Sequence, residues 1–179
     1  GAAIFASTVT VVGNAVFTGD IQKKTAGASN FAAGVNAGNS IESGGNSNVV
    51  VGDEAGTAIT TGDLNTAIGY ASLDANTTGG NNTAVGAAAL GANTTASNIV
   101  AVGFSALGLN TTGASNVAVG PYNLDANTTG GSNTAVGASA LGANTTGGSN
   151  TAVGSGVLAA NTTAANNSAF GATSLDANT

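Results

Sequence analysis

A glycine recurs every 17 residues through most of the chain, always in the same local context. A Val, Ile or Phe comes directly before it, and from the second copy onward a Leu follows four residues after it. The glycines are Gly52, Gly69, Gly86, Gly103, Gly120, Gly137, Gly154 and Gly171. The residues before them are Val51, Ile68, Val85, Val102, Val119, Val136, Val153 and Phe170, and the leucines are Leu73, Leu90, Leu107, Leu124, Leu141, Leu158 and Leu175. A period held over eight copies indicates an array of repeats, each packed on its neighbours.

Two places depart from the pattern. In the first copy Gly56 takes the Leu position and Ile59 takes the position where later copies have Asn, so this copy reads as degenerate. Upstream, the segment NFAAG (30–34) resembles a further copy, offset by 18 residues instead of 17. We therefore place the repeat domain at residues 30–179.

One copy has the composition of short strands and turns. NTAVG and the residues that follow are small or β-branched, whereas NTTGGS has the residues that turns prefer. A helix is disfavoured because Gly, Asn and Thr return in every copy. The repeat therefore predicts an all-β solenoid in which two short strands make one coil, with each Val stacked on the next Val, each Leu on the next Leu, and the repeat glycines at the corners.

One Val and one Leu per coil make a small apolar core for 17 ordered residues. Several chains that share one core would solve this problem, because Ala and Gly let backbones approach closely. We therefore expect a parallel homotrimer, in which the Val and Leu rows form the core of the coil and of the trimer. Val136→Asp should block assembly, since it would place three charges in one core layer.

Residues 1–29 differ from the repeats. The stretch STVTVVGNAVFTGDI has β-branched alternation interrupted by Gly-Asn and Gly-Asp pairs, which predicts a short β-rich stem with tight turns. The chain begins with Gly1 and has no Met, so we expect it to be a processed product or part of a longer polypeptide.

The composition excludes several functions. Only 6% of the residues are charged, the net charge is −6, and the two cations are Lys23 and Lys24, so a nucleic-acid partner is excluded on electrostatic grounds. No apolar run is long enough to insert this segment into a membrane as a helix. His and Cys are absent, and the glycines are not followed by the Lys-Ser/Thr of a phosphate-binding loop, so we expect no catalytic residues, no cofactor and no enzyme.

The repeat NTAVGASALGANTTGGS resembles the repeats of trimeric phage and prophage tail fibre proteins. More distantly, it resembles the NSVAIG-type head of YadA-like trimeric autotransporter adhesins. The resemblance covers about residues 30–179 and implies a homotrimeric left-handed parallel β-roll that projects from a virion or cell surface. It departs from the pattern at Ile99, which takes the Asn position four residues before Gly103.

Other features of the repeat have a structural interpretation beside a functional one. The Asn-Thr-Thr triplets match the glycosylation sequon, yet their 17-residue spacing favours an Asn that turns the chain and bonds to the next coil. Regular Thr pairs are also compatible with ice binding, although the neighbouring Gly-rich turns suit corners better than flat faces. The triplets begin at Asn76, Asn93, Asn110, Asn127, Asn144 and Asn161.

Acidic and aromatic residues offer few further sites. Asp53, Glu54 and Asp63 form the only acidic cluster, with too few oxygens for calcium, and Asp74, Asp125 and Asp176 recur three coils apart; no metal site is expected. Among the aromatics, Tyr70, Phe104, Tyr122 and Phe170, only Tyr122 beside Pro121 is a candidate for contact with a sugar.

These observations predict a structural, non-enzymatic segment of a virion tail fibre, located on the virion surface or outside the cell and supporting host attachment. Its expected partners are two further copies of the chain, other virion or fibre proteins, and a host surface glycan or protein. The alternatives are a bacterial trimeric surface adhesin, an ice-binding solenoid and a polysaccharide-degrading spike.

Overall fold

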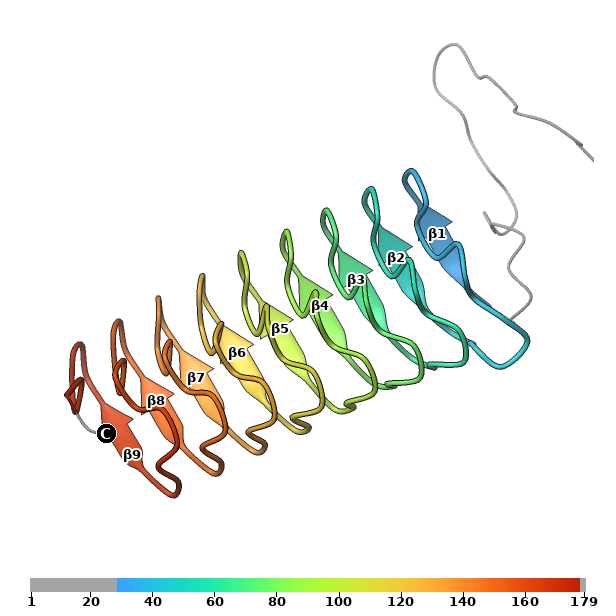
Figure 1. The fold of residues 1–179 in the computed structure, drawn as a ribbon. Coiled ribbons are helices and arrows are strands. Elements are labelled where there is room, and N and C mark those ends of the chain that lie inside the picture. The colour runs from blue at the N-terminus through green and yellow to red at the C-terminus, as the bar shows by residue number, and fades with distance from the viewer. Residues whose placement is uncertain (1–28, 178–179) are drawn as a thin grey trace, which may run out of the picture.

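The computed structural model describes residues 29–177, which wind into a parallel β-solenoid with one short strand in each coil (Figure 1). No helix occurs in this part of the chain, so the all-β prediction is confirmed there. The predicted stem lies outside the described residues, apart from Ser29. The strands are β1 (Phe31–Ala33), β2 (Val49–Val51), β3 (Thr66–Ile68), β4 (Thr83–Val85), β5 (Val100–Val102), β6 (Val117–Val119), β7 (Thr134–Val136), β8 (Thr151–Val153) and β9 (Ser168–Phe170).

The strands form a single sheet in chain order, and each strand pairs in parallel with the next. The pairing register equals the sequence period: Thr134 lies beside Thr151, and Val136 lies beside Val153. The predicted stacking of Val on Val is therefore confirmed. Phe31 pairs with Val49, so the NFAAG segment is a true first coil with one extra residue. At about 4.8 Å per coil, the nine strands span a rod on the order of 40 Å long.

We number each coil from position 1, the residue before the strand, to position 17, so that Asn133–Ser149 is one complete coil. Alternate residues of a strand point to opposite faces. In β7, Ala135 at position 3 points into the coil and is fully buried, whereas Thr134 and Val136 at positions 2 and 4 point outward and are partly exposed. The strands β2 to β9 repeat this arrangement, with Val50 in β2 and Ala in the other strands as the buried residue at position 3.

The rest of each coil is held by hydrogen bonds to neighbouring coils but forms no second strand within residues 29–177. Positions 7, 9 and 17 have positive φ in the complete coils, as at Ser139, Leu141 and Ser149. Such left-handed residues bend the chain sharply and prevent the extended pleat that a strand needs. The prediction of two strands per coil is therefore wrong, because each coil of the described residues has one strand.

The interior of the rod consists of rows of identical positions. Position 9 supplies the largest side chains, and position 8 supplies mostly Ala. The fully buried leucines are Leu73, Leu90, Leu107, Leu124, Leu141 and Leu158; Leu175, in the last coil, is half exposed. The Leu row therefore lies inside the single chain.

The first repeat, whose sequence reads as degenerate, has a compensating exchange of side chains. A Cβ on Gly56 would lie 2.8 Å from Cδ1 of Ile59 and 2.7 Å from Cγ1 of Val50, so the Ile side chain occupies the space that Leu fills in later coils. Ile59 is fully buried. The preceding coil shows the same exchange, with Gly38 beside Ile41. The pair Gly and Ile thus replaces the pair Leu and Asn, and the core remains filled.

The glycine after each of the strands β1 to β8 lies at a close approach between coils. Gly137 has a φ of 128°, and a Cβ at this position would lie 2.6 Å from the carbonyl carbon of Gly154 in the next coil. A side chain would therefore both strain the backbone and push the coils apart. The glycines from Gly52 to Gly154 that the sequence placed at corners therefore lie where a side chain would not fit.

Candidate functional site

A row of asparagines at position 1 closes each coil and joins it to the next. Nδ2 of Asn65 donates to the carbonyl of Gly79 in the same coil at 2.9 Å, and Oδ1 of Asn65 accepts from the backbone N–H of Asn82 at 3.1 Å. Asn65 is almost fully buried, so these bonds satisfy polar groups that water does not reach. The 17-residue recurrence of this Asn is the signal in the sequence that marks the row.

A second row of asparagines, at position 12, bonds side chain to side chain. Nδ2 of Asn127 donates to Oδ1 of Asn110 at 2.8 Å and to the carbonyl of Gly130 at 2.9 Å. Oδ1 of Asn127 in turn accepts from Nδ2 of Asn144 at 2.9 Å. The prediction that these asparagines bond between coils is confirmed.

Burial of the position-12 row decides how the glycosylation sequons should be interpreted. The six asparagines of the Asn-Thr-Thr triplets are all fully buried, and no glycan could be attached to them without opening the coil. Oδ1 of Asn161 is the one buried side-chain polar atom of the described residues that lacks a hydrogen-bond partner. The row is therefore a structural ladder in the folded rod, and its last described rung leaves an acceptor open.

Ile99 interrupts the first ladder without opening the coil. Its backbone N–H still donates to Oδ1 of Asn82 at 3.1 Å, and its side chain is fully buried. Asn98, displaced by one position, has a φ of 62° and is exposed. The departure from the repeat therefore exchanges a buried hydrogen-bonding side chain for an apolar one.

The Val row lies on the outer face of the sheet, whereas the Leu row lies inside the coil. The sequence predicted that both rows would form one core, and within the single chain they are separate. The side chains at position 4 are half-buried or exposed along the whole rod, because position 3 is the one that points inward. Ile68 and Val119 are each more than a third exposed, and Phe170 in β9 is 68% exposed. Val and Thr at position 2 lie beside this row on the same face. The solenoid thus has a continuous outer sheet face with a largely apolar row.

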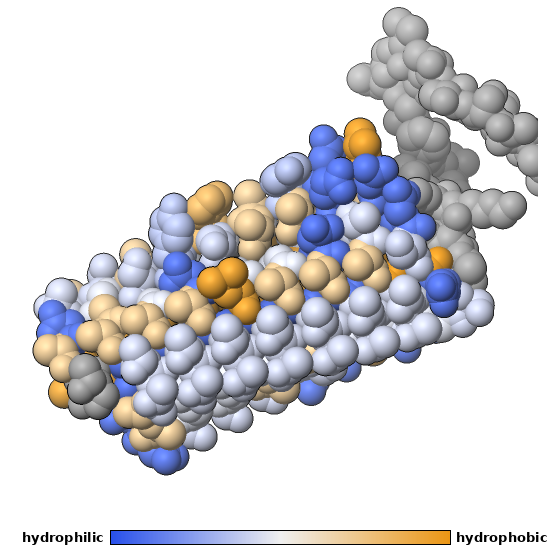
Figure 2. All heavy atoms as spheres, viewed as in Figure 1, coloured by the Kyte–Doolittle hydropathy of each residue, from blue (hydrophilic) through white to orange (hydrophobic). Residues whose placement is uncertain are grey.

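The Thr pairs lie at positions 13 and 14 of the coil, directly after the Asn of position 12. The hydroxyl of Thr128 donates to the carbonyl of Thr145 at 3.1 Å, and the equivalent bond recurs from coil to coil. Thr129 and Thr146 at position 14 are exposed. Figure 2 shows one side of the rod as straight rows of residues of near-neutral hydropathy. One hydroxyl of each pair therefore joins the coils, and the other faces solvent.

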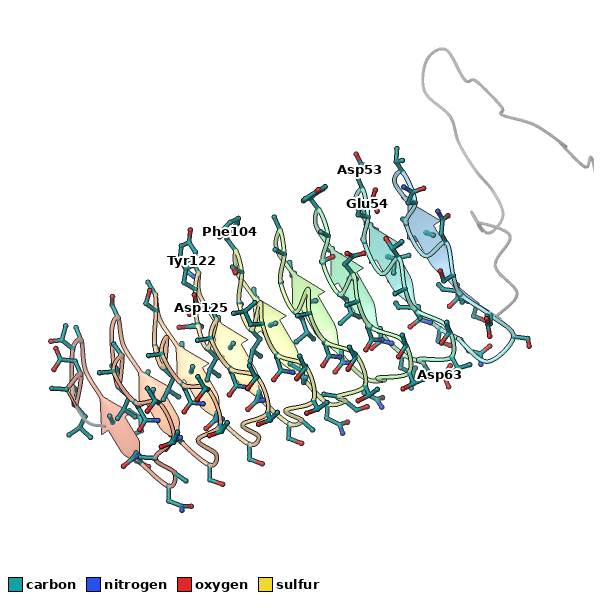
Figure 3. All side chains as sticks on the ribbon, in the orientation of Figure 1. Asp53, Glu54, Asp63, Phe104, Tyr122 and Asp125 are labelled. Atoms are coloured by element: carbon teal, nitrogen blue, oxygen red, sulfur yellow. The ribbon has the colours of Figure 1, made fainter. Side chains whose placement is uncertain are left out.

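The acidic residues bond to neighbouring coils instead of converging. Asp53 accepts from the backbone N–H of Val35 at 3.0 Å, Glu54 accepts from Nδ2 of Asn36 at 3.0 Å, and Asp63 accepts from the backbone N–H of Asn46. Figure 3 shows Asp63 far from the first two, on the other side of the coil. No three acidic side chains gather into a candidate metal site among residues 29–177.

The pKa of Asp125 departs from its ordinary value. Partial burial raises its pKa, and hydrogen bonds from the backbone N–H groups of Asp125 and Ala126 oppose the rise.

Three aromatic residues, Tyr70, Phe104 and Tyr122, lie in the turn that follows the strand, at positions 6 and 7. Phe104 and Tyr122 contact each other edge to face, with ring centroids 5.2 Å apart, and both are about half exposed (Figure 3). Tyr70, two coils before Phe104, is also exposed. The predicted sugar-contact candidate, Tyr122, therefore has an aromatic neighbour that the sequence did not place beside it.

The described part of the chain has no helix of the length and apolar character needed to cross a bilayer. Comparison of the sequence and the fold with family models, with curated proteins and with solved structures finds no significant match.

Proposed function

We propose that this chain is a non-enzymatic segment of a homotrimeric fibre on a virion surface, where it supports attachment to a host. The observation that carries the proposal is the outer sheet face, which extends over nine strands and presents an uninterrupted row of position-4 side chains to solvent. A single soluble chain gains nothing from a partly exposed apolar row of this length, whereas association with further copies would bury it.

The magnitude favours self-association. Complete burial of one Val or Ile side chain contributes about 1.5–3 kcal/mol, so burial of the exposed half contributes about 1 kcal/mol for each residue of the row. Because the row repeats with the coil period, copies aligned in parallel would present matching rows over the full length of the rod. A flat, regular face of this kind suits an assembly of identical chains.

The remaining features of the rod agree with a mechanical role. The coils are joined by backbone hydrogen bonds and by the two Asn ladders, which make the rod stiff along its axis. Only 6% of the residues of the whole chain are charged. The rod can therefore hold a binding surface away from the particle that carries it.

The test is the oligomeric state of the 179-residue chain, measured by multi-angle light scattering. We expect a trimer for the wild type and a monomer for Val136→Asp, which places a charge in the position-4 row of the outer sheet face. Ser139→Asp is the matched control, because it adds the same charge to the same coil at an exposed turn position where another coil has Glu54. A folded wild-type monomer, or a trimer of Val136→Asp, would overturn the proposal.

A further inference from the structure

Two neighbouring coils carry aromatic residues at turn positions where the three coils that follow have small ones. Position 6 is Phe104 in the coil that begins at Ile99, and position 7 is Tyr122 in the following coil. In the next coil the same two positions are Ala138 and Ser139. The near-identical coils serve as an internal comparison: they show that the fold itself does not need aromatic side chains at these positions.

The backbone holds the two rings in a fixed relation. The N–H of Tyr122 donates to the carbonyl of Phe104 at 2.9 Å, within the same inter-coil bond pattern that runs along the whole rod. The ring planes are 71° apart, with centroids separated by 5.2 Å. The pair therefore forms an edge-to-face corner, with the rings 51% and 48% exposed. Neither ring fills the interior of a coil.

The size of this corner decides between two kinds of partner. An aromatic side chain buries about 150–250 Å² when fully covered, so the exposed halves of two rings offer on the order of 200 Å². One side of a stable protein–protein interface covers about 800 Å². The turn residues around the pair are Pro121, Ala138 and Ser139, which add little apolar area. The corner therefore suits a small rigid ligand better than a protein surface.

The chemistry around the corner excludes polyanions. The described residues contain no Lys or Arg, since the two cations of the chain are Lys23 and Lys24. Ser105 and Ser139 supply hydroxyl groups at position 7 of the coils on either side of Tyr122, and Asp125 lies three residues after Tyr122 in the same coil (Figure 3). A ligand that combines flat C–H faces with many hydroxyl groups matches this combination of rings and hydrogen-bonding groups.

We propose that the Phe104–Tyr122 pair is a carbohydrate-binding site for a neutral glycan. The inference rests on the proposed function, because it identifies the class of host molecule that the fibre would contact. Tyr70 lies at position 6 two coils earlier, about 10 Å along the rod at the coil spacing, and is 63% exposed. A glycan chain that runs along these turns contacts both Tyr70 and the pair, so an oligosaccharide binds more tightly than a monosaccharide.

The test starts with an array of neutral and anionic oligosaccharides, probed with the full chain, followed by titration of the best binder. Tyr70 and Tyr122 are the two tyrosines and the chain has no Trp, so tyrosine fluorescence reports binding directly. Phe104→Ala combined with Tyr122→Ser gives these two coils the residues that Ala138 and Ser139 provide elsewhere. We expect at least a tenfold loss of affinity, with unchanged thermal unfolding and oligomeric state.

A second variant exploits the repeat to separate binding from stability. Ala138→Phe with Gly156→Tyr, added to the double variant, rebuilds the same corner two coils further along, because Gly156 has a φ of 63° and Tyr122 one of 55°. We expect this variant to recover at least half of the lost binding signal. Recovery would not follow from a general effect of the substitutions on folding.

The outcomes separate the two proposals. Loss of glycan binding in the double variant and its recovery in the rebuilt one support the site. A wild-type trimer that binds no glycan on the array, or a double variant that binds as the wild type does, overturns the site and leaves the fibre proposal intact. Selective binding of anionic glycans would also contradict the inference. A wild-type monomer overturns the fibre proposal, whatever the array shows.

Discussion

Replacement of Gly137 by Ala should destabilise the rod far more than the addition of one methyl group normally does. The new Cβ would lie 2.6 Å from the carbonyl carbon of Gly154, whereas the closest real Cβ contacts begin near 3.0 Å. The obstacle is backbone and not a flexible side chain, so the two coils must move apart. The φ of 128° adds strain, because residues with a Cβ rarely adopt it.

The expected cost can be estimated from these two effects. Backbone strain in a sparsely populated region costs about 1–3 kcal/mol, and insertion of a methyl group into a packed site typically costs about 1–3 kcal/mol. We therefore expect a loss of about 2–6 kcal/mol. The loss should be concentrated at the junction between the coils of Gly137 and Gly154, where the N–H of Gly154 donates to the carbonyl of Val136 at 2.8 Å.

Gly142→Ala is the matched control, in the same coil. A Cβ there would lie 3.4 Å from the nearest atom, which is ordinary contact, and Ala159 occupies the same repeat position one coil later. We expect a change of less than about 1 kcal/mol, with a sign that favours the folded state, because Ala restricts the unfolded chain more than Gly does.

The assay is urea unfolding of both variants followed by circular dichroism, together with amide hydrogen exchange at Gly154. We expect a lower midpoint for Gly137→Ala and faster exchange of this amide than in the wild type. Equal midpoints for Gly137→Ala and Gly142→Ala would refute the argument that glycine is required by the close approach of the coils.

Two further predictions concern the packing of the core and the raised pKa of Asp125. Leu124→Gly and Asn127→Ile together reproduce the pair Gly56 and Ile59. In a double-mutant cycle measured by urea unfolding, the double variant should lose at least about 1 kcal/mol less stability than the sum of the two single variants. Simple additivity would contradict the inference that the Ile side chain fills the space left by Leu. Because burial raises the pKa of Asp125 above its unfolded value of 3.8, its contribution to stability falls as the pH rises through this range. Asp125→Asn should therefore be more stable than the wild type at neutral pH and equal to it below about pH 3.8, and thermal unfolding at the two pH values tests this; a difference that grows on acidification would have the wrong sign.

The period of the sequence predicted the stacking well but predicted the orientation of side chains less well. Equal spacing of Val136 and Val153 was sufficient to place them beside each other, since a 17-residue period in a solenoid leaves one register. The period did not reveal that Ala135, and not Val136, points inward, because inward and outward residues of a three-residue strand recur with the same spacing. The left-handed conformation of Leu141 was hidden for a similar reason, as Leu is not a residue that normally indicates positive φ.

The Phe104–Tyr122 contact also could not be predicted from the repeat period. The sequence singled out Tyr122 as the one residue able to contact a sugar, but Phe104 lies 18 residues earlier, one more than the period. The left-handed turn brings position 6 of one coil next to position 7 of the following one, as the hydrogen bond between their backbones shows. This offset depends on the turn geometry, which composition and spacing do not encode.

The contact pattern has a consequence for how such a chain can change its length over generations. Each strand contacts only the strand before it and the strand after it. Deletion of Asn133–Ser149 would let Asn150 take the place of Asn133 beside Asn116. The backbone N–H of Asn150 would then donate to Oδ1 of Asn116, as that of Asn133 does now. Recombination between near-identical stretches of the gene would therefore add or remove whole coils, about 4.8 Å at a time, and leave every remaining junction unaltered. Rod length can thus vary among descendants without any accompanying change in the packing of a coil.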